Sequence, residues 1–367
     1  MIALEQAVAA PLCSRKMAEA GARVIKVEAS GGDFARHYDG VVDGESAYFT
    51  WLNVGKESIV MDLRASADRA LLLRMLRSCD VFVQNLRPGS VAAMGFDHAS
   101  LHAVNPRLIR CDIVGFARPQ EHFGRKAYDL LIQAESGLAS VNGMPDGPSR
   151  VGISIVDIAT GMTAYQAVLE ALMRRSAGGA GDSLQIAMFD CMAEWMTVPF
   201  LYTSYTGQEP KKLGLQHPGI APYGAFNCAD GLSLLIAVQQ DREWVRLCNA
   251  VIGRPEMALD ARFATNTLRV AHRDSVDGAV AECMALMNSQ EAIRLLRDAD
   301  LAYAPVGRVA DLVRHPALRT FDVQTAAGSV RLPLPAERCG VGTAPRSVPA
   351  CNEHGAAIRA EFAADLP

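Results

Sequence analysis

The sequence lacks the short motifs that mark many nucleotide-binding and hydrolytic enzymes. No G-x-G-x-x-G turn follows its first predicted strand, and it contains neither a P-loop nor a G-x-S-x-G elbow. A dinucleotide site, a P-loop NTPase and an α/β-hydrolase are therefore not predicted. None of the nine cysteines forms a C-x-x-C pair, so nothing indicates a zinc or redox site. We expect no bound metal. We also expect most of the cysteines to be buried as free thiols, in a protein of the reducing cytoplasm.

Long apolar runs and an excess of positive charge are missing as well. The 367 residues carry a formal net charge of −4, and such a field does not attract nucleic acid. No stretch is apolar enough to span a membrane, and residues 1–11 lack the basic segment of a secretory signal. We predict a cytoplasmic protein that binds neither nucleic acid nor membrane.

The chain does contain a regular alternation of strand and helix patterns. Short apolar or alternating segments predict strands at residues 23–28, 58–63, 80–86, 107–116 and 183–189. Amphipathic segments between them predict helices at residues 11–20, 65–77 and 128–139. This alternation predicts an α/β fold built on a Rossmann-like, doubly wound parallel sheet.

Composition divides the chain into four parts. Gly, Pro, Gln and Tyr become frequent between residues 202 and 223, which is typical of a linker or a functional loop. We predict a large α/β domain over residues 1–200, a linker or active-site loop over 201–229, and a smaller α+β domain over 230–309. Residues 310–367 show no core of their own, and we expect them to return and pack on the large domain.

One carboxylate stands where the sequence pattern changes. The apolar run V-G-I-S-I-V at residues 151–156 predicts a short buried strand or extended segment, and apolar residues recur at helical spacing from Ile158 to Leu172. Asp157 lies between the two, at the start of the predicted helix, where unpaired N–H groups and the helix dipole favour an anion. Two interpretations remain open: a helix cap, or a carboxylate nucleophile at the end of a strand.

A set of longer pieces occurs in a fixed order along the chain. They are G-A-R-V-I-K-V-E (21–28), G-D-F-A-R (32–36), Y-F-T-W-L-N-V-G-K-E-S-I-V-M-D-L-R (48–64), Q-N-L-R-P-G (84–89), N-P-R-L-I (105–109), K-A-Y-D-L-L-I-Q-A-E-S-G-L (126–138), H-P-G-I-A-P-Y-G-A-F (217–226) and D-A-R-F-A-T-N-T-L-R-V (260–270). Each piece alone is a weak signal. The ordered set resembles the family III CoA-transferases, which include formyl-CoA transferase and carnitine CoA-transferase.

This resemblance implies an activity and a nucleophile. It implies an enzyme that moves CoA from an acyl-CoA donor to a small carboxylic acid, with no permanently bound cofactor, in an interlocked homodimer. Asp157 matches the aspartate that forms an aspartyl-CoA thioester in the family. Asp129, in the K-A-Y-D piece, is its rival, although for that residue a helix-cap role is favoured.

The resemblance also implies contacts to the substrates. The positions that match CoA-binding residues are Met61, Arg64, Asn85, Leu86, Arg87, Lys126 and Tyr128. Taken singly, the basic residues among them could be solvated surface charges, and Met61 and Leu86 ordinary core. His217 and Gly219 stand where the family closes a glycine-rich loop over the acyl group. The alternative for this loop is a rigid interdomain turn.

Departures from formyl-CoA transferase bear on the substrate. Ala29 and Ala93 stand where that enzyme has arginines, and Val8 aligns with its glutamine. The start of the chain and the G-D-F-A-R piece are closer to members that act on small dicarboxylates such as itaconate or mesaconate. Two alternatives remain. One is an enzyme like the α-methylacyl-CoA racemases, although Tyr128 replaces their second acid/base histidine. The other is a CoA-binding protein without transfer activity.

Overall fold

The computed structural model describes residues 1–117, 120–336 and 346–363, which form two compact units. Unit 1 comprises Met1–Ala139, Arg150–Val198 and Arg319–Pro367, whereas unit 2 comprises Ser140–Ser149 and Pro199–Leu318. Two segments differ from the sequence-based division, because residues 140–149 and 310–318 group with unit 2. For residues 140–149, one contact to unit 2 is evident: the backbone N–H of Gly214 donates a 3.2 Å hydrogen bond to the carbonyl of Gly143.

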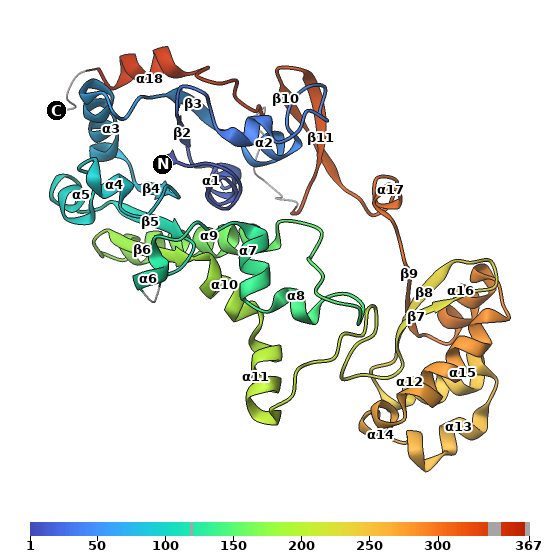
Figure 1. Ribbon diagram of the computed structural model, residues 1–367. Coiled ribbons are helices and arrows are strands. Elements are labelled where there is room, and N and C mark those ends of the chain that lie inside the picture. Colours follow the sequence, from blue (N-terminus) through green and yellow to red (C-terminus); the bar gives the residue numbers. More distant parts are fainter. Residues whose placement is uncertain (118–119, 337–345, 364–367) are drawn as a thin grey trace. The chain divides into compact units, whose positions relative to one another are not determined.

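Unit 1 is built on one sheet of six parallel strands (Figure 1). Their spatial order is β3-β2-β1-β4-β5-β6, with bounds Glu57–Val60, Ile25–Glu28, Ile2–Leu4, Val81–Gln84, Ile109–Val114 and Asp182–Ala187. This is the order of a doubly wound, Rossmann-like sheet. The predicted parallel α/β sheet is therefore confirmed.

Helices cover both faces of this sheet, which explains why β1, β2 and β4 are buried along their whole length. One face packs on α3 (Ser66–Ser78), α5 (His98–Val104) and α18 (Gly355–Glu361). The other packs on α1 (Ala9–Glu19) and α9 (Ile155–Ser176). The remaining elements of unit 1 are η1 (Phe34–His37), α2 (Ala47–Leu52), α4 (Ser90–Ala93), α6 (Gln120–Phe123), α7 (Asp129–Glu135), α10 (Met188–Trp195), and the hairpin β10 (Thr320–Thr325) with β11 (Gly328–Pro333).

The close approach of α1 and α9 depends on one glycine. A Cβ added at Gly161 would lie 2.6 Å from the carbonyl oxygen of Ala9 and 2.9 Å from Cβ of Leu12. Contacts that short do not occur, so only glycine permits this spacing. The N-terminal part of α9 is thereby held against the first turn of α1.

Unit 2 combines a three-stranded antiparallel sheet with helices. The strands pair in the order β7 (Tyr223–Asn227), β8 (Ser233–Ala237) and β9 (Ala302–Pro305). Its other elements are α8 (Leu138–Val141), α11 (Thr197–Thr206), α12 (Asp241–Arg246), η2 (Leu247–Ile252), α13 (Pro255–Leu259), η3 (Ala261–Phe263), α14 (Asn266–Ala271), α15 (Arg273–Ala285), α16 (Ser289–Asp298) and α17 (Val309–Leu312), of which α8 and α11 begin in unit 1. Its core centres on Trp244, Phe263 and Leu296, each buried. The predicted smaller α+β domain thus has a sheet and a core of its own.

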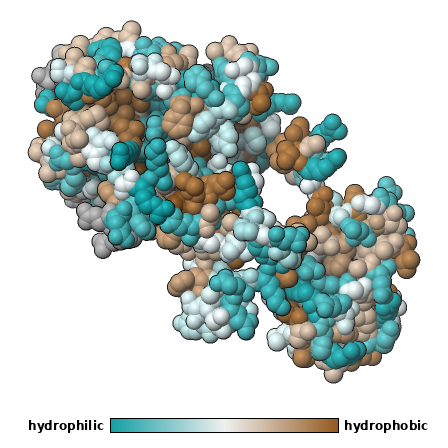
Figure 2. Space-filling view, viewed as in Figure 1, coloured by the Kyte–Doolittle hydropathy of each residue, from teal (hydrophilic) through white to brown (hydrophobic). Residues whose placement is uncertain are grey.

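Hydrophobic residues reach the surface among hydrophilic ones on the visible face of both units (Figure 2). Exposed hydrophobic side chains of the protein include three of α11, Val198, Phe200 and Tyr205, which are 76%, 64% and 86% exposed. No residue of this helix is buried. Over the part of the chain that is described, no helix is long and apolar enough to cross a membrane.

Candidate active site

Asp157 is the third residue of α9 and lines a cavity of about 850 Å³ in unit 1. The residue at the N-cap of this helix, Ser154, makes no side-chain capping hydrogen bond. Its hydroxyl lies 3.2 Å from that of Tyr48 instead. The carboxylate of Asp157 is half-buried, and no described residue donates a hydrogen bond to it.

The strand predicted directly before Asp157 does not form. Residues 151–154 are irregular, and Ile153 is 54% exposed rather than buried. The side chain of Gln133 takes the place of a neighbouring strand, because its Oε1 accepts from the N–H of Val151 at 2.8 Å. Asp157 therefore follows a loop, and the interpretation that places it at the end of a strand is wrong in this respect.

Asp129 caps α9 from another helix. Its Oδ1 accepts hydrogen bonds from the backbone N–H groups of Val156 at 2.7 Å and Asp157 at 3.3 Å. Its Oδ2 accepts from the side chain of the fully buried Gln133 at 2.7 Å. The cap role favoured for Asp129 fits this geometry, although the helix that it caps is α9 and not its own. The negative charge of Asp129 also interacts favourably with the positive, N-terminal end of the α9 dipole.

This arrangement raises the pKa of Asp157 to about 7, first because the carboxylate is removed from water and second because Asp129 repels a second negative charge. The sequence-based expectation was that the helix N-terminus would favour the ionised form. Burial and Asp129 together overturn that expectation, because Asp129 accepts hydrogen bonds from the N–H groups of Val156 and Asp157 and brings a like charge to the same helix end.

Aromatic side chains that were not singled out from the sequence line the same cavity. Tyr38 and Tyr48 meet edge to face with ring centroids 5.5 Å apart. Burial and the nearby carboxylates Asp33 and Asp157 raise the pKa of Tyr38 to about 12, so its hydroxyl keeps its proton and can donate to an anion. Tyr48 begins the quoted Y-F-T-W-L piece, which was the available signal.

The residues predicted to bind CoA line two cavities that adjoin. Asn85, Arg87, Lys126 and Tyr128 line the cavity of Asp157. Met61 and Arg64 line a second cavity of about 280 Å³. Leu86 and Gln6 line both cavities. The fold thus brings all seven predicted positions, which come from three separate parts of the sequence, to two cavities that share two lining residues.

The polar groups among them differ in what they already contact. Arg64 is 90% exposed and forms an ion pair with Asp62 at 2.8 Å. Arg87 and Lys126 are exposed, and within the described ranges their side chains have no hydrogen-bond or ion-pair partner. Asn85 uses its side chain to hold the backbone of Gln6. Arg87 and Lys126 are therefore the cations most available to an anionic ligand.

The predicted substrate loop belongs to unit 2. His217 Nδ1 accepts from the N–H of Gly219 at 3.1 Å, and the imidazole stacks on Tyr223 with centroids 5.3 Å apart. Arg273 donates to the carbonyls of His217 at 2.7 Å and Ile220 at 2.8 Å. These contacts fix the loop within its own unit, and its role toward the acyl group stays a prediction.

In the described part of the chain, no three His, Cys, Asp or Glu side chains are grouped so that they could hold a metal ion. The chemistry available at this site is that of a half-buried carboxylate surrounded by tyrosines and nearby cations. Such a group can attack an activated acyl carbon.

Comparison with known proteins gives one family. The family model described as CoA-transferase family III matches residues 1–354. An acetyl-CoA:oxalate CoA-transferase of Acetobacter aceti is 34% identical, over 99% of this chain and 95% of its own. A succinate–glutarate CoA-transferase of Agrobacterium fabrum is 32% identical, over 99% and 94%. The crystal structure of a CAIB/BAIF family protein from Brucella suis has a TM-score of 0.82 at 33% identity, over 98% of this chain and 97% of the other.

The chain belongs to the family III CoA-transferases. Both named relatives are CoA-transferases and match almost the whole chain, so the prediction of a CoA-transferase that uses CoA thioesters is confirmed. The alternatives of a racemase and of a binding protein without transfer activity are not favoured by these relatives.

Proposed function

We propose that this enzyme transfers CoA between small carboxylic acids through a covalent intermediate on Asp157. The observation that carries the proposal is the position of Asp157: it lines a cavity of about 850 Å³ in unit 1 beside the predicted CoA contacts, and no described residue donates a hydrogen bond to its carboxylate. A carboxylate suits this reaction because each exchange keeps the acyl group activated. No metal and no permanently bound cofactor is required for such exchanges.

The first half of the reaction loads CoA onto the enzyme. An Asp157 oxygen attacks the carbonyl carbon of the donor thioester, the C–S bond breaks, and a mixed anhydride and CoA thiolate result. The thiolate then attacks Cγ of Asp157. The anhydride C–O bond breaks, so that the donor acid leaves as a carboxylate and an aspartyl-CoA thioester remains.

The second half runs the same steps in reverse. The acceptor carboxylate attacks Cγ of the aspartyl thioester, and CoA thiolate leaves. That thiolate attacks the acceptor carbonyl of the new anhydride, which releases the acceptor as its CoA thioester and Asp157 as a carboxylate. Tyr38, Tyr48 and Tyr128 line the cavity, and we propose that their hydroxyls donate to the acid oxygens.

The acceptor class that we propose is a C4 or C5 dicarboxylate such as succinate, mesaconate or itaconate. The relative from Agrobacterium fabrum is named for succinate and glutarate, and the one from Acetobacter aceti for oxalate. Lys126, Arg125 and Arg150 line the cavity together with the tyrosines. Cations and hydroxyls of this kind suit a second carboxylate.

We further propose a cytoplasmic, interlocked homodimer. Exposed apolar side chains on α11, among them Phe200 and Tyr205, need a cover that a second copy would supply. All the described cysteines are free thiols, as expected in a reducing compartment. Light scattering after size-exclusion chromatography tests the dimer, and a monomer at micromolar concentration would contradict it.

The transfer mechanism is tested with Asp157→Ala. This variant should lose transfer activity while it still folds and binds CoA, because loss of the side chain removes only the nucleophile. In the parent enzyme, incubation with an acyl-CoA should add the mass of CoA, less one water, to the peptide that contains Asp157. Retained transfer in Asp157→Ala, or an adduct at Asp129 instead, would overturn the assignment.

A further inference from the structure

Gln6 is one of two residues, with Leu86, that line both of these cavities. It follows β1, and Asn85 follows β4. These strands are neighbours at the centre of the sheet, where the order of strands reverses direction. Open α/β sheets bind ligands outside the carboxyl ends of their strands at this point. A ligand that extends from the Met61 cavity to the Asp157 cavity passes Gln6, which lines both.

The backbone of Gln6 is fixed on both sides. Asn85 Oδ1 accepts from its N–H at 3.0 Å, and Asn85 Nδ2 donates to its carbonyl at 2.8 Å. The next residue, Ala7, has a φ of 63°, an unfavourable value for a residue with a side chain. Its N–H donates to Oδ1 of Asp33 at 3.1 Å. Ala7 also packs in the same apolar cluster as Ile158, which follows Asp157 on α9.

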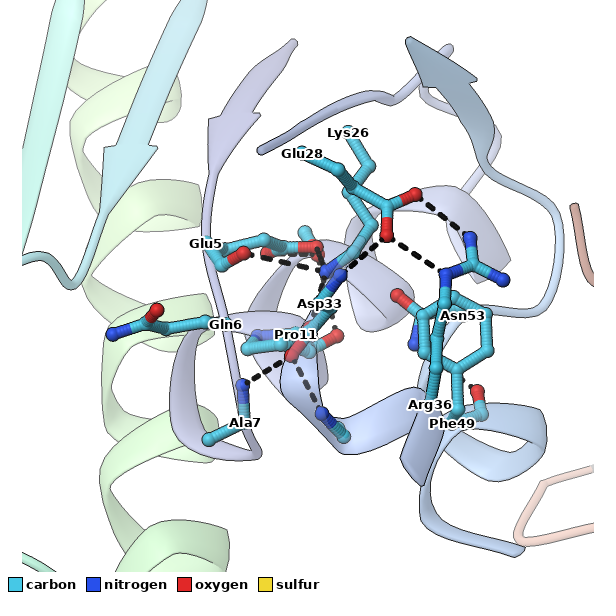
Figure 3. A network of polar contacts seen from close by, with 12 residues as sticks. Glu5, Gln6, Ala7, Pro11, Lys26, Glu28, Asp33, Arg36, Phe49 and Asn53 are labelled. Carbon is cyan, nitrogen blue, oxygen red and sulfur yellow. Dashed lines mark hydrogen bonds and ion pairs between the residues drawn. The ribbon is translucent and has the colours of Figure 1, made fainter. Parts of the chain in front are cut away.

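A buried group of charges supports this turn (Figure 3). Lys26 contacts Asp33 at 2.8 Å and Glu5 at 3.4 Å, and Lys56 contacts Glu5 at 2.7 Å. All four side chains have no solvent exposure. Two positive and two negative charges balance, and removal of one partner would leave a buried charge unpaired, which is strongly unfavourable. The turn at Gln6 and Ala7 therefore has a rigid base.

The side chain of Gln6 takes no part in this network. In Figure 3 it points away from the ion pairs of Asp33 and Lys26. Across residues 1–117, 120–336 and 346–363, no hydrogen-bond partner is found for its carboxamide. Gln6 thus combines a fixed backbone with a carboxamide whose N–H₂ donor and C=O acceptor have no partner among the described residues, and it lines both cavities.

We propose that Gln6 binds the pantetheine arm of the acyl-CoA, a role that rests on the proposed function. The arm joins the nucleotide to the thioester and carries two secondary amides, each with one donor and one acceptor. A primary carboxamide can donate to the C=O and accept from the N–H of such an amide. Gln6 is thus a substrate-binding residue, Asn85 and Asp33 are positioning residues, and the thioester carbonyl beyond Gln6 is directed to Asp157.

The test compares two thioesters of the same acid in Gln6→Leu, which keeps the volume but loses both hydrogen-bonding groups. With acyl-CoA, kcat/KM should fall roughly two- to tenfold for each hydrogen bond lost, mainly through KM. With the S-ethyl thioester, which has no amide, kcat/KM should not change. Equal losses on both thioesters, or no loss on acyl-CoA, would overturn the proposal.

Further measurements separate this role from folding and from the chemistry at Asp157. Affinity for a non-reactive acyl-CoA thioether, measured in an Asp157→Ala background, should fall in the same proportion on Gln6→Leu, whatever the nucleophile is. Gln6→Glu keeps the size and the acceptor but not the donor, and serves if Gln6→Leu unfolds. Gln166→Leu, the same change at an exposed site bonded to Glu170, should alter none of these values.

Discussion

The carboxylate of Asp129 accepts a hydrogen bond from the backbone N–H of Asp157 at 3.3 Å, so two acids share one helix N-terminus. Asp129 also accepts a hydrogen bond from the backbone N–H of Val156 at 2.7 Å. The groups that would have stabilised a negative charge on Asp157 are therefore engaged elsewhere. The pKa of Asp157 is therefore raised, first by burial and second by the charge of Asp129, although the residue lies in the first turn of a long helix.

The same relationship has a consequence for the proposed reaction. A free Asp157 carboxylate is repelled by Asp129 and has lost part of its hydration. The mixed anhydride and the aspartyl-CoA thioester are uncharged at this position, so their formation relieves both effects. Asp129 would thus favour acylation of its neighbour without contact with the substrate carbonyl.

The pH dependence of the reaction follows from this pair. Because only the carboxylate attacks, kcat/KM for acyl-CoA should rise with pH and level off above about 7, the pKa of Asp157. Asp129→Asn removes the repulsion but leaves Asp157 buried. The midpoint of the pH–rate profile should therefore move to lower pH, but stay above the pKa of an ordinary aspartate, ~4. A pH–rate profile of both enzymes measures this.

The control for that profile is Glu135→Gln. Glu135 lies on the same helix, α7, but forms an exposed ion pair with Arg125 at 2.9 Å. Its loss should leave the midpoint of the profile in place. An unchanged midpoint in Asp129→Asn would show that Asp129 does not act through charge on Asp157.

Stability should depend on pH through the same carboxylate. The folded-state pKa of about 7 lies above that of the unfolded chain, so the folded state binds the Asp157 proton more tightly. The stability contributed by this group is full below about pH 4 and is lost as pH rises to about 7. Asp157→Asn should therefore stabilise the protein at pH 8 but not at pH 4. Urea midpoints at the two pH values test this, and an equal difference at both would contradict it.

The cations near the cavities should contribute unequally to CoA binding. Lys126 has no ion-pair partner among the described residues, whereas Arg64 is already paired with Asp62. Lys126→Ala should weaken acyl-CoA binding roughly two- to fivefold, and Arg64→Ala less, with both effects larger at low salt. Arg294→Ala, an exposed change in unit 2, is the control. If both variants bind acyl-CoA as tightly as the parent enzyme, the proposed contacts of Lys126 and Arg64 to CoA are wrong.

Acceptor choice tests the loop that contains His217. C4 and C5 dicarboxylates should outperform formate, oxalate and acetate as acceptors, and His217→Ala should lower kcat/KM more for a dicarboxylate than for a matched monocarboxylate. The reason is that an imidazole near the acyl group can bind a second carboxylate. Initial rates with a panel of acids measure this. Equal losses on both acids, or a preference for monocarboxylates, would reject the role of His217 and leave CoA transfer intact.

The parallel α/β sheet, five of its six strands to within a few residues, and the long helix that begins near Asp157 could be predicted from the sequence, whereas the central strand β1 (Ile2–Leu4) was not predicted. Periodicity and strand–helix alternation are properties of short stretches of sequence, so they can be recognised without knowing how the elements pack. The ordered pieces of sequence also pointed to the family that the comparisons show.

Which groups meet at the site depends on contacts between parts of the chain that are far apart in the sequence. Asp129 and Val156 are 27 residues apart, and Gln6 and Asn85 are 79 apart, so no local pattern predicts either hydrogen bond. The apolar run before Asp157 has the composition of a strand, but the buried amide of Gln133 takes its backbone bonds and leaves it irregular. A carboxylate's pKa and a side chain's freedom to bind depend on such distant neighbours, because burial and charge act through space and not along the chain.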